Sequence, residues 1–236
     1  MSKLFKSGLL ITGLSIAMSS AQSAEITHSF NAGAGLGFGY SRFNFKVNEA
    51  AGVPSVLRKY DLAKNTPLGN LSLGYRLRWC NVMAGLEADY LFGDFKRSGD
   101  PNYLSNGATS RPSQASSNGA FGAALKVGYY LSPDVVGYVG AGIETRKFKF
   151  GYIIQGQPAD SINSSYTQTA FAGRLGFDFA LSPSVTLGAE YRKAFYNGQI
   201  KQNGITTVKF KPETLDTVLL HVRFTFDLPK TWLAQR

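Results

Sequence analysis

Residues 74–90 read GYRLRWCNVMAGLEADY. Before Cys80 and Asn81, apolar or aromatic side chains alternate with the basic Arg76 and Arg78, and after them the alternation resumes with the acidic Glu87 and Asp89. An alternation of period two predicts β-strands, because successive side chains of a strand point to opposite faces. Two such runs separated by two residues predict a tight antiparallel hairpin.

The same alternation recurs along the chain and predicts eight strands, at 28–41, 69–79, 82–93, 119–131, 135–146, 168–181, 185–195 and 216–226. One face of every predicted strand is uncharged and largely apolar. The opposite face is rich in glycine and carries His221 and a charge network of Arg76, Arg78, Glu87, Asp89, Lys126, Glu144, Arg174, Asp178, Glu190, Arg192 and Arg223.

Alternation alone fits both a soluble β-sandwich, with the apolar face buried, and a membrane barrel, with the apolar face in lipid. Three features favour the barrel. Short connections at 80–81, 132–134 and 182–184 alternate with long ones at 42–68, 94–118, 147–167 and 196–214. Each strand has roughly the ten residues needed to cross a bilayer at a tilt. Aromatic residues gather near both ends of the apolar face, as in interfacial girdles.

We therefore predict an all-β fold, namely an eight-stranded antiparallel up-and-down transmembrane β-barrel with short periplasmic turns and long extracellular loops. Closure follows from physics, because lipid offers no water to an unpaired backbone group at a sheet edge. The 17% charged fraction lies below the roughly 25% of soluble domains and agrees with this prediction.

The N-terminus predicts a secretory signal peptide over 1–24, with Lys3 and Lys6 before the apolar stretch LLITGLSIAM and the small residues SSAQSA. The alternative is an apolar N-terminal helix of the mature fold. The barrel is then expected over 25–226, followed by a short periplasmic tail, DLPKTWLAQR, over 227–236. The chain after residue 24 keeps a net charge of +8. Export argues against nucleic acid as the partner of this basic chain.

Four short motifs, GLEADY at 85–90, YVGAGIE at 138–144, LGAEYR at 187–192 and TVLLHVRFTF at 217–226, occur in hairpin order. With them the chain resembles the opacity-type outer-membrane β-barrels, a family that includes the membrane domain of outer-membrane protein A. The resemblance implies a surface antigen, adhesin or narrow porin-like barrel in the outer membrane of a Gram-negative bacterium. It also implies a signal for the barrel-assembly machinery in the last strand, at Val218, Leu220, Val222, Phe224 and Phe226. The chain departs from outer-membrane protein A in having no room for a peptidoglycan-binding domain, so a cell-wall anchoring role is not expected.

The inward charges allow two interpretations: a salt-bridge and water network that fills the lumen, which we favour, or a selective channel. The long connections are the other candidate site, because surface loops on a rigid scaffold commonly bind partners. They hold a set of lysines that we expect to bind anions: Lys147, Lys149, Lys201, Lys209 and Lys211. Lipopolysaccharide phosphates, heparin-like host chains and haem are candidate ligands, and a solvated loop facing the lipid surface is the alternative.

The sequence thus predicts a non-enzymatic surface protein that interacts with outer-membrane lipid, lipopolysaccharide and a host or anionic ligand. A narrow porin for small solutes is the second hypothesis, and a lipid A-modifying barrel enzyme is the third. The chain has only two histidines, His28 and His221, and one cysteine, Cys80, which we expect in a turn. This inventory suggests neither a Ser/His hydrolase nor a metal site, and no cofactor is expected.

Overall fold

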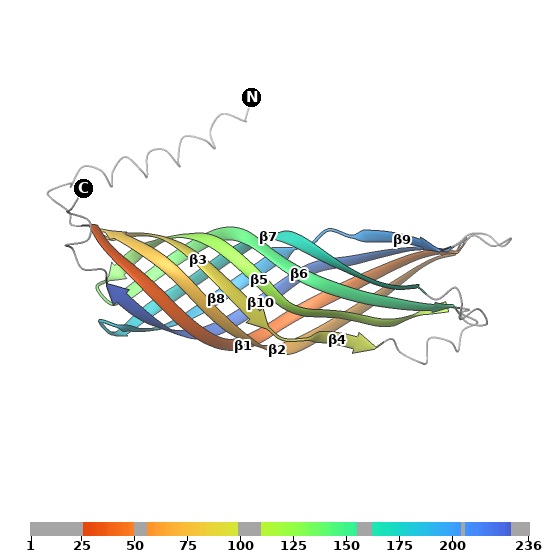
Figure 1. Cartoon of the computed structure of the whole chain (residues 1–236), viewed down its shortest axis with the longest axis horizontal. Helices are drawn as coiled ribbons and strands as arrows, with labels where there is room; N and C mark the ends of the chain where they lie inside the picture. The colour runs from red at the N-terminus through yellow and green to blue at the C-terminus, as the bar shows by residue number, and fades with distance from the viewer. Residues whose placement is uncertain (1–25, 50–55, 99–109, 155–161, 204–205, 228–236) are drawn as a thin grey trace, which may run out of the picture.

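The computed structural model describes residues 26–49, 56–98, 110–154, 162–203 and 206–227, which form one elongated cylinder of tilted strands (Figure 1). No described helix is long and apolar enough to cross a membrane. The ten strands are β1 (Ile26–Glu49), β2 (Val56–Trp79), β3 (Val82–Phe92), β4 (Phe95–Ser98), β5 (Ser110–Ser132), β6 (Val135–Ile154), β7 (Ile162–Ser182), β8 (Val185–Phe195), β9 (Gln199–Asn203) and β10 (Thr206–Asp227). The expected signal peptide and all of the expected tail except Asp227 lie outside the described residues.

Eight of these strands close into a barrel, as the sequence predicts. The order around the wall is β1, β2, β3, β5, β6, β7, β8 and β10, and β10 pairs antiparallel with β1 to close the ring. The short strands β4 and β9 continue β3 and β8 along the chain, and they pair with β5 and β10 respectively. Closure removes the sheet edges that lipid does not tolerate.

The barrel is strongly sheared. A row of register partners that starts at Phe30 in β1 passes through the seven other strands and returns to β1 at Tyr40, ten residues further on. Ten residues of about 3.3 Å each, spread over eight strand spacings of about 4.8 Å, tilt the strands by about 40°. Such a cylinder is narrow enough for side chains to fill.

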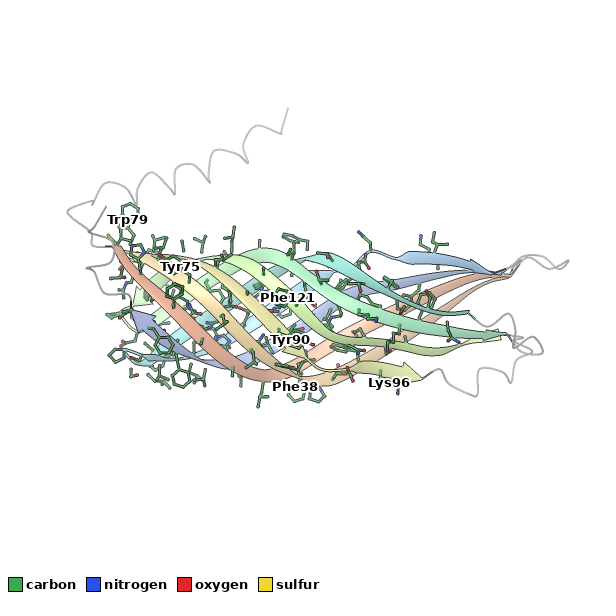
Figure 2. The ribbon with its side chains drawn as sticks, viewed as in Figure 1. Phe38, Tyr75, Trp79, Tyr90, Lys96 and Phe121 are labelled. Atoms are coloured by element: carbon green, nitrogen blue, oxygen red, sulfur yellow. The ribbon has the colours of Figure 1, made fainter. Side chains whose placement is uncertain are left out.

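The apolar face looks outward. Leu73, Leu125 and Phe177 are 68%, 66% and 57% exposed, whereas the charged side chains of the opposite face are buried. Figure 2 shows aromatic side chains such as Phe38 and Trp79 projecting from the outside of the wall. The predicted girdle residues are all exposed, with Phe30, Trp79, Tyr129, Phe179 and Phe226 towards the short turns and Tyr40, Tyr90, Phe92, Phe171 and Tyr191 towards the other end. Lipid is the environment in which this arrangement is stable.

The short turns lie where the sequence places them. Cys80 and Asn81 join β2 to β3, and Cys80 adopts a left-handed backbone conformation with φ of 51°. The cysteine is free and exposed, as expected of a turn position. Similar turns join β5 to β6 and β7 to β8.

The predicted long loops need correction, because most of their described residues are strand. The wall extends beyond the aromatic girdle that lies away from the short turns. This extension consists of the segments 42–49, 56–68, 95–98, 110–117, 147–154, 162–170, 199–203 and 206–214. We call these segments together the outer tier. The extension runs towards the right of Figure 1, with β4 and β9 at its sides. The connections at 50–55, 99–109, 155–161 and 204–205 lie outside the described residues.

The outer tier is two sheets and not a closed ring. Pairing between β2 and β3 stops at Gly69 and Phe92, and pairing between β7 and β8 stops at Phe171 and Phe195. Beyond those points, β4, β5, β6 and β7 form one sheet, and β9, β10, β1 and β2 form the other. In Figure 1 the two groups of strands separate towards the right-hand end.

An aromatic core joins the two sheets. Phe150 of β6 stacks on Phe210 of β10 with ring centroids 4.8 Å apart, and Phe148 packs edge-on against Tyr196 at 4.9 Å. The rest of this buried cluster includes Phe95, Leu68 and Leu215. The polarity of the inward side chains therefore inverts along the strands. In the closed barrel β6 directs Glu144 and Arg146 inward, whereas in the outer tier it directs Phe148 and Phe150 inward. Water around the outer tier explains the inversion, because apolar groups there gain by facing inward.

Candidate functional site: the lumenal charge network and the basic outer tier

Alternate positions on β3, β5 and β8 bring a lysine between two carboxylates in the middle of the lumen. Lys126 Nζ lies 2.7 Å from Glu87 Oε1 and 2.6 Å from Glu190 Oε2. The hydroxyl of Tyr138 donates to the same Glu190 oxygen at 3.0 Å. All four side chains are buried, so each charge has a partner in place of the water it has lost.

A second cluster centres on Asp89. Arg192 holds both carboxylate oxygens of Asp89 through Nη1 and Nη2, at 2.8 and 3.2 Å. Arg174 Nη1 approaches Asp89 Oδ2 to 2.5 Å and also reaches Glu87 Oε1 at 3.2 Å. Bidentate arginine–carboxylate pairs combine charge with fixed geometry, so Asp89 locks three strands together.

A third cluster lies towards the short turns. Asp178 accepts hydrogen bonds from Arg223 Nη1 at 2.6 Å and from Arg76 Nη2 at 2.6 Å, and it contacts His221 Nε2 at 2.9 Å. Arg223 Nη2 also lies 3.3 Å from Glu87 Oε2, which connects this cluster to the central one. His221, one of the two histidines of the chain, thus has a buried carboxylate partner.

The network continues towards the outer tier around the predicted Glu144, through Arg146 and Tyr196, which were not predicted. Arg146 forms an ion pair with Glu144 at 3.3 Å, and its guanidinium carbon lies 5.3 Å from the centre of the Phe95 ring. The Tyr196 hydroxyl donates to Glu144. Arg146 keeps the inward parity of Glu144, so extending the alternation by one step past 144 would have found it.

Arg78 is the predicted network residue that the structure places elsewhere. Its Nε donates to the backbone carbonyl of Cys80 at 3.1 Å, and its guanidinium stacks on the Tyr130 ring at 3.9 Å. The side chain has inward parity but sits at the rim by the short turn, where solvent and a backbone carbonyl replace a carboxylate. Parity fixes the face of a strand residue and not its depth in the barrel.

Glycines make room for the network at two close approaches. A Cβ on Gly188 would come within 2.2 Å of Asp178 Oδ1 and 2.3 Å of His221 Nε2, and a Cβ on Gly122 would come within 2.7 Å of Asp89 Oδ1. A side chain at either position would displace an ion pair. Gly188 and Gly122 are therefore matched to the buried carboxylates of Asp178 and Asp89 and to the ring of His221.

We predict that the purified protein gives no stable ion conductance in planar bilayers. The charged side chains cross-link strands on opposite sides of the lumen, and the aromatic core fills the outer tier. Recordings at about 0.1 and 1 M salt would test this, with the Asp89→Ala variant as the comparison. Discrete conductance steps of uniform size from the unaltered protein would contradict it and would favour the porin hypothesis.

The lysines predicted to bind anions lie on strands of the outer tier. Lys147 and Lys149 are exposed on β6, between the inward Phe148 and Phe150, and Lys209 is exposed on β10. Lys201 and Lys211 occupy β9 and β10, but their side chains lie outside the described part. Lys96 of β4, which the sequence analysis did not select, is also exposed on this end of the molecule (Figure 2).

Register relates two of these lysines directly. Lys96 pairs with Ser116 of β5, Ser116 pairs with Lys149 of β6, and Lys149 pairs with Ser165 of β7. Paired residues of an antiparallel sheet share a face, so Lys96 and Lys149 lie on the same outward row with one serine between them.

The inner side of β7 carries Tyr166. Burial raises the pKa of its hydroxyl, so this group stays neutral.

The assembly-signal residues Val218, Leu220, Val222, Phe224 and Phe226 all lie exposed on the outer face of β10. They face outward in the closed barrel, and their role in assembly stays a prediction. No group of three or more potential metal-ligating side chains occurs within the described ranges.

A closed, sheared barrel with an apolar exterior, two aromatic girdles and a charged lumen defines the class of transmembrane β-barrels. The family model described as outer membrane protein beta-barrel domain matches residues 9–210. The chain belongs to this family, and its place is the outer membrane of a Gram-negative bacterium.

Several solved structures are similar to this chain. The attachment invasion locus protein Ail of Yersinia pestis, in complex with the heparin analogue sucrose octasulfate, has 17% identity, with 83% of this chain and 99% of that chain covered and a TM-score of 0.41. Neisserial surface protein A has 16% identity, 86% and 99% coverage and a TM-score of 0.44. The outer membrane protease OmpT of Escherichia coli has 11% identity, 84% and 97% coverage and a TM-score of 0.45. No curated protein sequence gives a significant match.

Proposed function

We propose that this protein is a non-enzymatic surface barrel whose outer tier binds polyanions bearing sulfate or phosphate groups. The observation that carries the proposal is the distribution of charge. The segments 42–68, 94–118, 147–167 and 196–214 together hold 13 lysines and arginines against 6 aspartates and glutamates. They therefore account for seven of the eight net positive charges of the chain after residue 24.

The rest of the barrel is nearly neutral, because its buried acids and bases pair with one another in the lumen. The excess charge thus belongs to the segments that we place outside the cell, and the exposed Lys147, Lys149 and Lys209 stand there on the two sheets of the outer tier. Exposed lysines on such a support attract anions over a distance of about a Debye length, roughly 10 Å at 0.1 M salt. Sulfated host glycans and the phosphorylated core of lipopolysaccharide present the same chemistry to this surface.

The lysines Lys147 and Lys149 provide the test. In phospholipid nanodiscs, the double variant Lys147→Gln/Lys149→Gln is expected to bind a heparin hexasaccharide about three- to tenfold more weakly, since each exposed ionic contact contributes about 0.5 kcal/mol. Titration calorimetry at about 50 and 300 mM salt would measure this, and affinity should fall at the higher salt. A parallel titration with phosphorylated lipopolysaccharide core oligosaccharide distinguishes the two sources.

Arg78→Gln is the control, because it removes a positive charge at the opposite, short-turn end. It should leave both titrations unchanged. Equal weakening by Arg78→Gln and by the lysine variants, or binding that does not respond to salt, would contradict a site in the outer tier. Binding of neutral dextran with similar affinity would also contradict it.

A further inference from the structure

The outer half of β7 is an edge strand. It pairs with β6 on one side, and on its other side no described strand pairs with it. On one side, 162–169 pairs with β6 from Tyr152 to Thr145, and on the other side the pairing with β8 ends at Phe171. The chain after β8 crosses to the other sheet, where β9 pairs with β10. In an antiparallel edge strand every second residue directs its N–H and C=O away from the sheet, so β7 presents a row of backbone donors and acceptors.

The outer tier has four such edges, and β7 differs from the other three in its sequence. Exposed edges are normally protected by lysine, other charges or proline. The part of β2 that pairs only with β1, at 56–68, contains Arg58, Lys59, Lys64 and Pro67. The edge strand β4 contains Lys96 and Arg97, and the edge strand β9 contains Lys201. The β7 edge reads INSSYTQTA over 162–170 and contains neither charge nor proline. Asn163, Ser165, Thr167 and Thr169 form its exposed outer side.

We infer that the 162–170 edge of β7 is a docking site for an extended acidic peptide, which adds to the sheet as a further strand. Main-chain hydrogen bonds would provide the affinity, as in other cases of β-strand addition. Charge complementarity selects an acidic partner, because the neighbouring positions on β6 that pair with Thr167 and Ser165 are Lys147 and Lys149. An added strand would place its outward side chains two strands away from these lysines.

The inner side of the edge also has unmet hydrogen-bonding capacity. The Tyr166 hydroxyl and Gln168 Oε1 are buried and have no hydrogen-bond partner within the described part of the protein. Both have the inward parity of β7, next to the aromatic core. A strand laid along β7 directs alternate side chains towards the same interior, so hydroxyl-bearing residues at those positions would fit. The expected peptide therefore alternates acidic residues outward with serine or threonine inward.

A capped peptide of four Thr-Glu repeats is a suitable probe, added to the full protein in phospholipid nanodiscs. Amide hydrogen exchange followed by NMR should show every second amide of 162–170 exchanging fast in the free protein, and slowing at least tenfold when the peptide is bound. The same peptide with all its backbone nitrogens methylated has lost its main-chain donors and should give no slowing. Uniformly slow exchange in the free protein, or equal effects of the two peptides, would overturn the inference.

The chain offers a matched pair of variants that separates this site from polyanion binding. Ser165 on β7 and Ser116 on β5 both pair with Lys149, one on each side of it. A glutamate at either position places the same negative charge beside Lys149, but only Ser165 borders the open edge. Ser165→Glu is expected to weaken Thr-Glu peptide binding about tenfold through like-charge repulsion across the added strand, while Ser116→Glu leaves it within about twofold.

Heparin hexasaccharide binding should respond to both variants alike, because it depends on Lys149 and not on the edge. Loss of peptide binding in both variants would show that the peptide is held only as a polyanion and would overturn the edge site. Peptide binding that survives Ser165→Glu would overturn it as well. Absence of heparin binding by the unaltered protein, with the peptide result intact, would overturn only the proposed function.

Discussion

Asp89→Ala is expected to lower the free energy of unfolding by about 3–5 kcal/mol, because it removes the carboxylate that two buried guanidinium groups share. Arg174 and Arg192 both bind Asp89, and all three side chains are at most 1% exposed. Urea unfolding of the protein folded into phospholipid vesicles would measure the change. Asp89→Asn keeps the size of the side chain and should lose most of the same stability, which separates the charge from the cavity.

The ion pair between Lys193 and Asp216 is the matched control. It lies on the outer face of the wall, with side-chain exposures of 39% and 26%. Asp216→Ala should cost at most about 1 kcal/mol, as is usual for solvent-accessible pairs. Similar losses for Asp89→Ala and Asp216→Ala would mean that the lumen is hydrated enough to screen its charges and that the network does not hold the barrel together.

Leu125→Arg is expected to destabilise the folded protein by about 2–4 kcal/mol, because it places a charge near the bilayer midplane. Leu125 is 66% exposed and stands on β5 midway between Tyr129 of the short-turn girdle and Phe121, which pairs with Tyr90 of the other girdle. The same vesicle unfolding experiment measures this change. The result tests the orientation of the whole barrel, since an exposed arginine on a soluble protein costs little.

Thr167→Arg on β7 is the control for this change. Thr167 is also outward and exposed, but it lies in the outer tier, where water surrounds the wall. The substitution should change stability by less than about 0.5 kcal/mol. If Leu125→Arg were as harmless as Thr167→Arg, the apolar band between the girdles would not face lipid.

The outer tier shows where local sequence patterns are insufficient to predict the structure. Residues 147–150, Lys-Phe-Lys-Phe, alternate as regularly as any predicted strand, yet we expected a loop there. In this stretch lysines stand on the outward face, where the strands below have apolar residues. The solvent outside changes from lipid to water at this height, so a strand that continues must exchange the polarity of its faces. The face on which each side chain lies follows from the local alternation of residues. The position along the strand at which lipid gives way to water depends on the assembled barrel.

The alternation of residues is enough to specify the eight crossing strands, the face on which each side chain stands and the position of every tight turn, because a strand repeats every two residues whatever it packs against. Which charges meet depends on the assembled barrel. A shear of ten residues around the barrel brings Asp89 to Arg192 and Asp178 to Arg76, which are 103 and 102 residues apart in the chain, and leaves Arg78 at the rim. The assembled barrel also opens into two sheets above the membrane, because hydrogen-bonded closure is obligatory in lipid and optional in water.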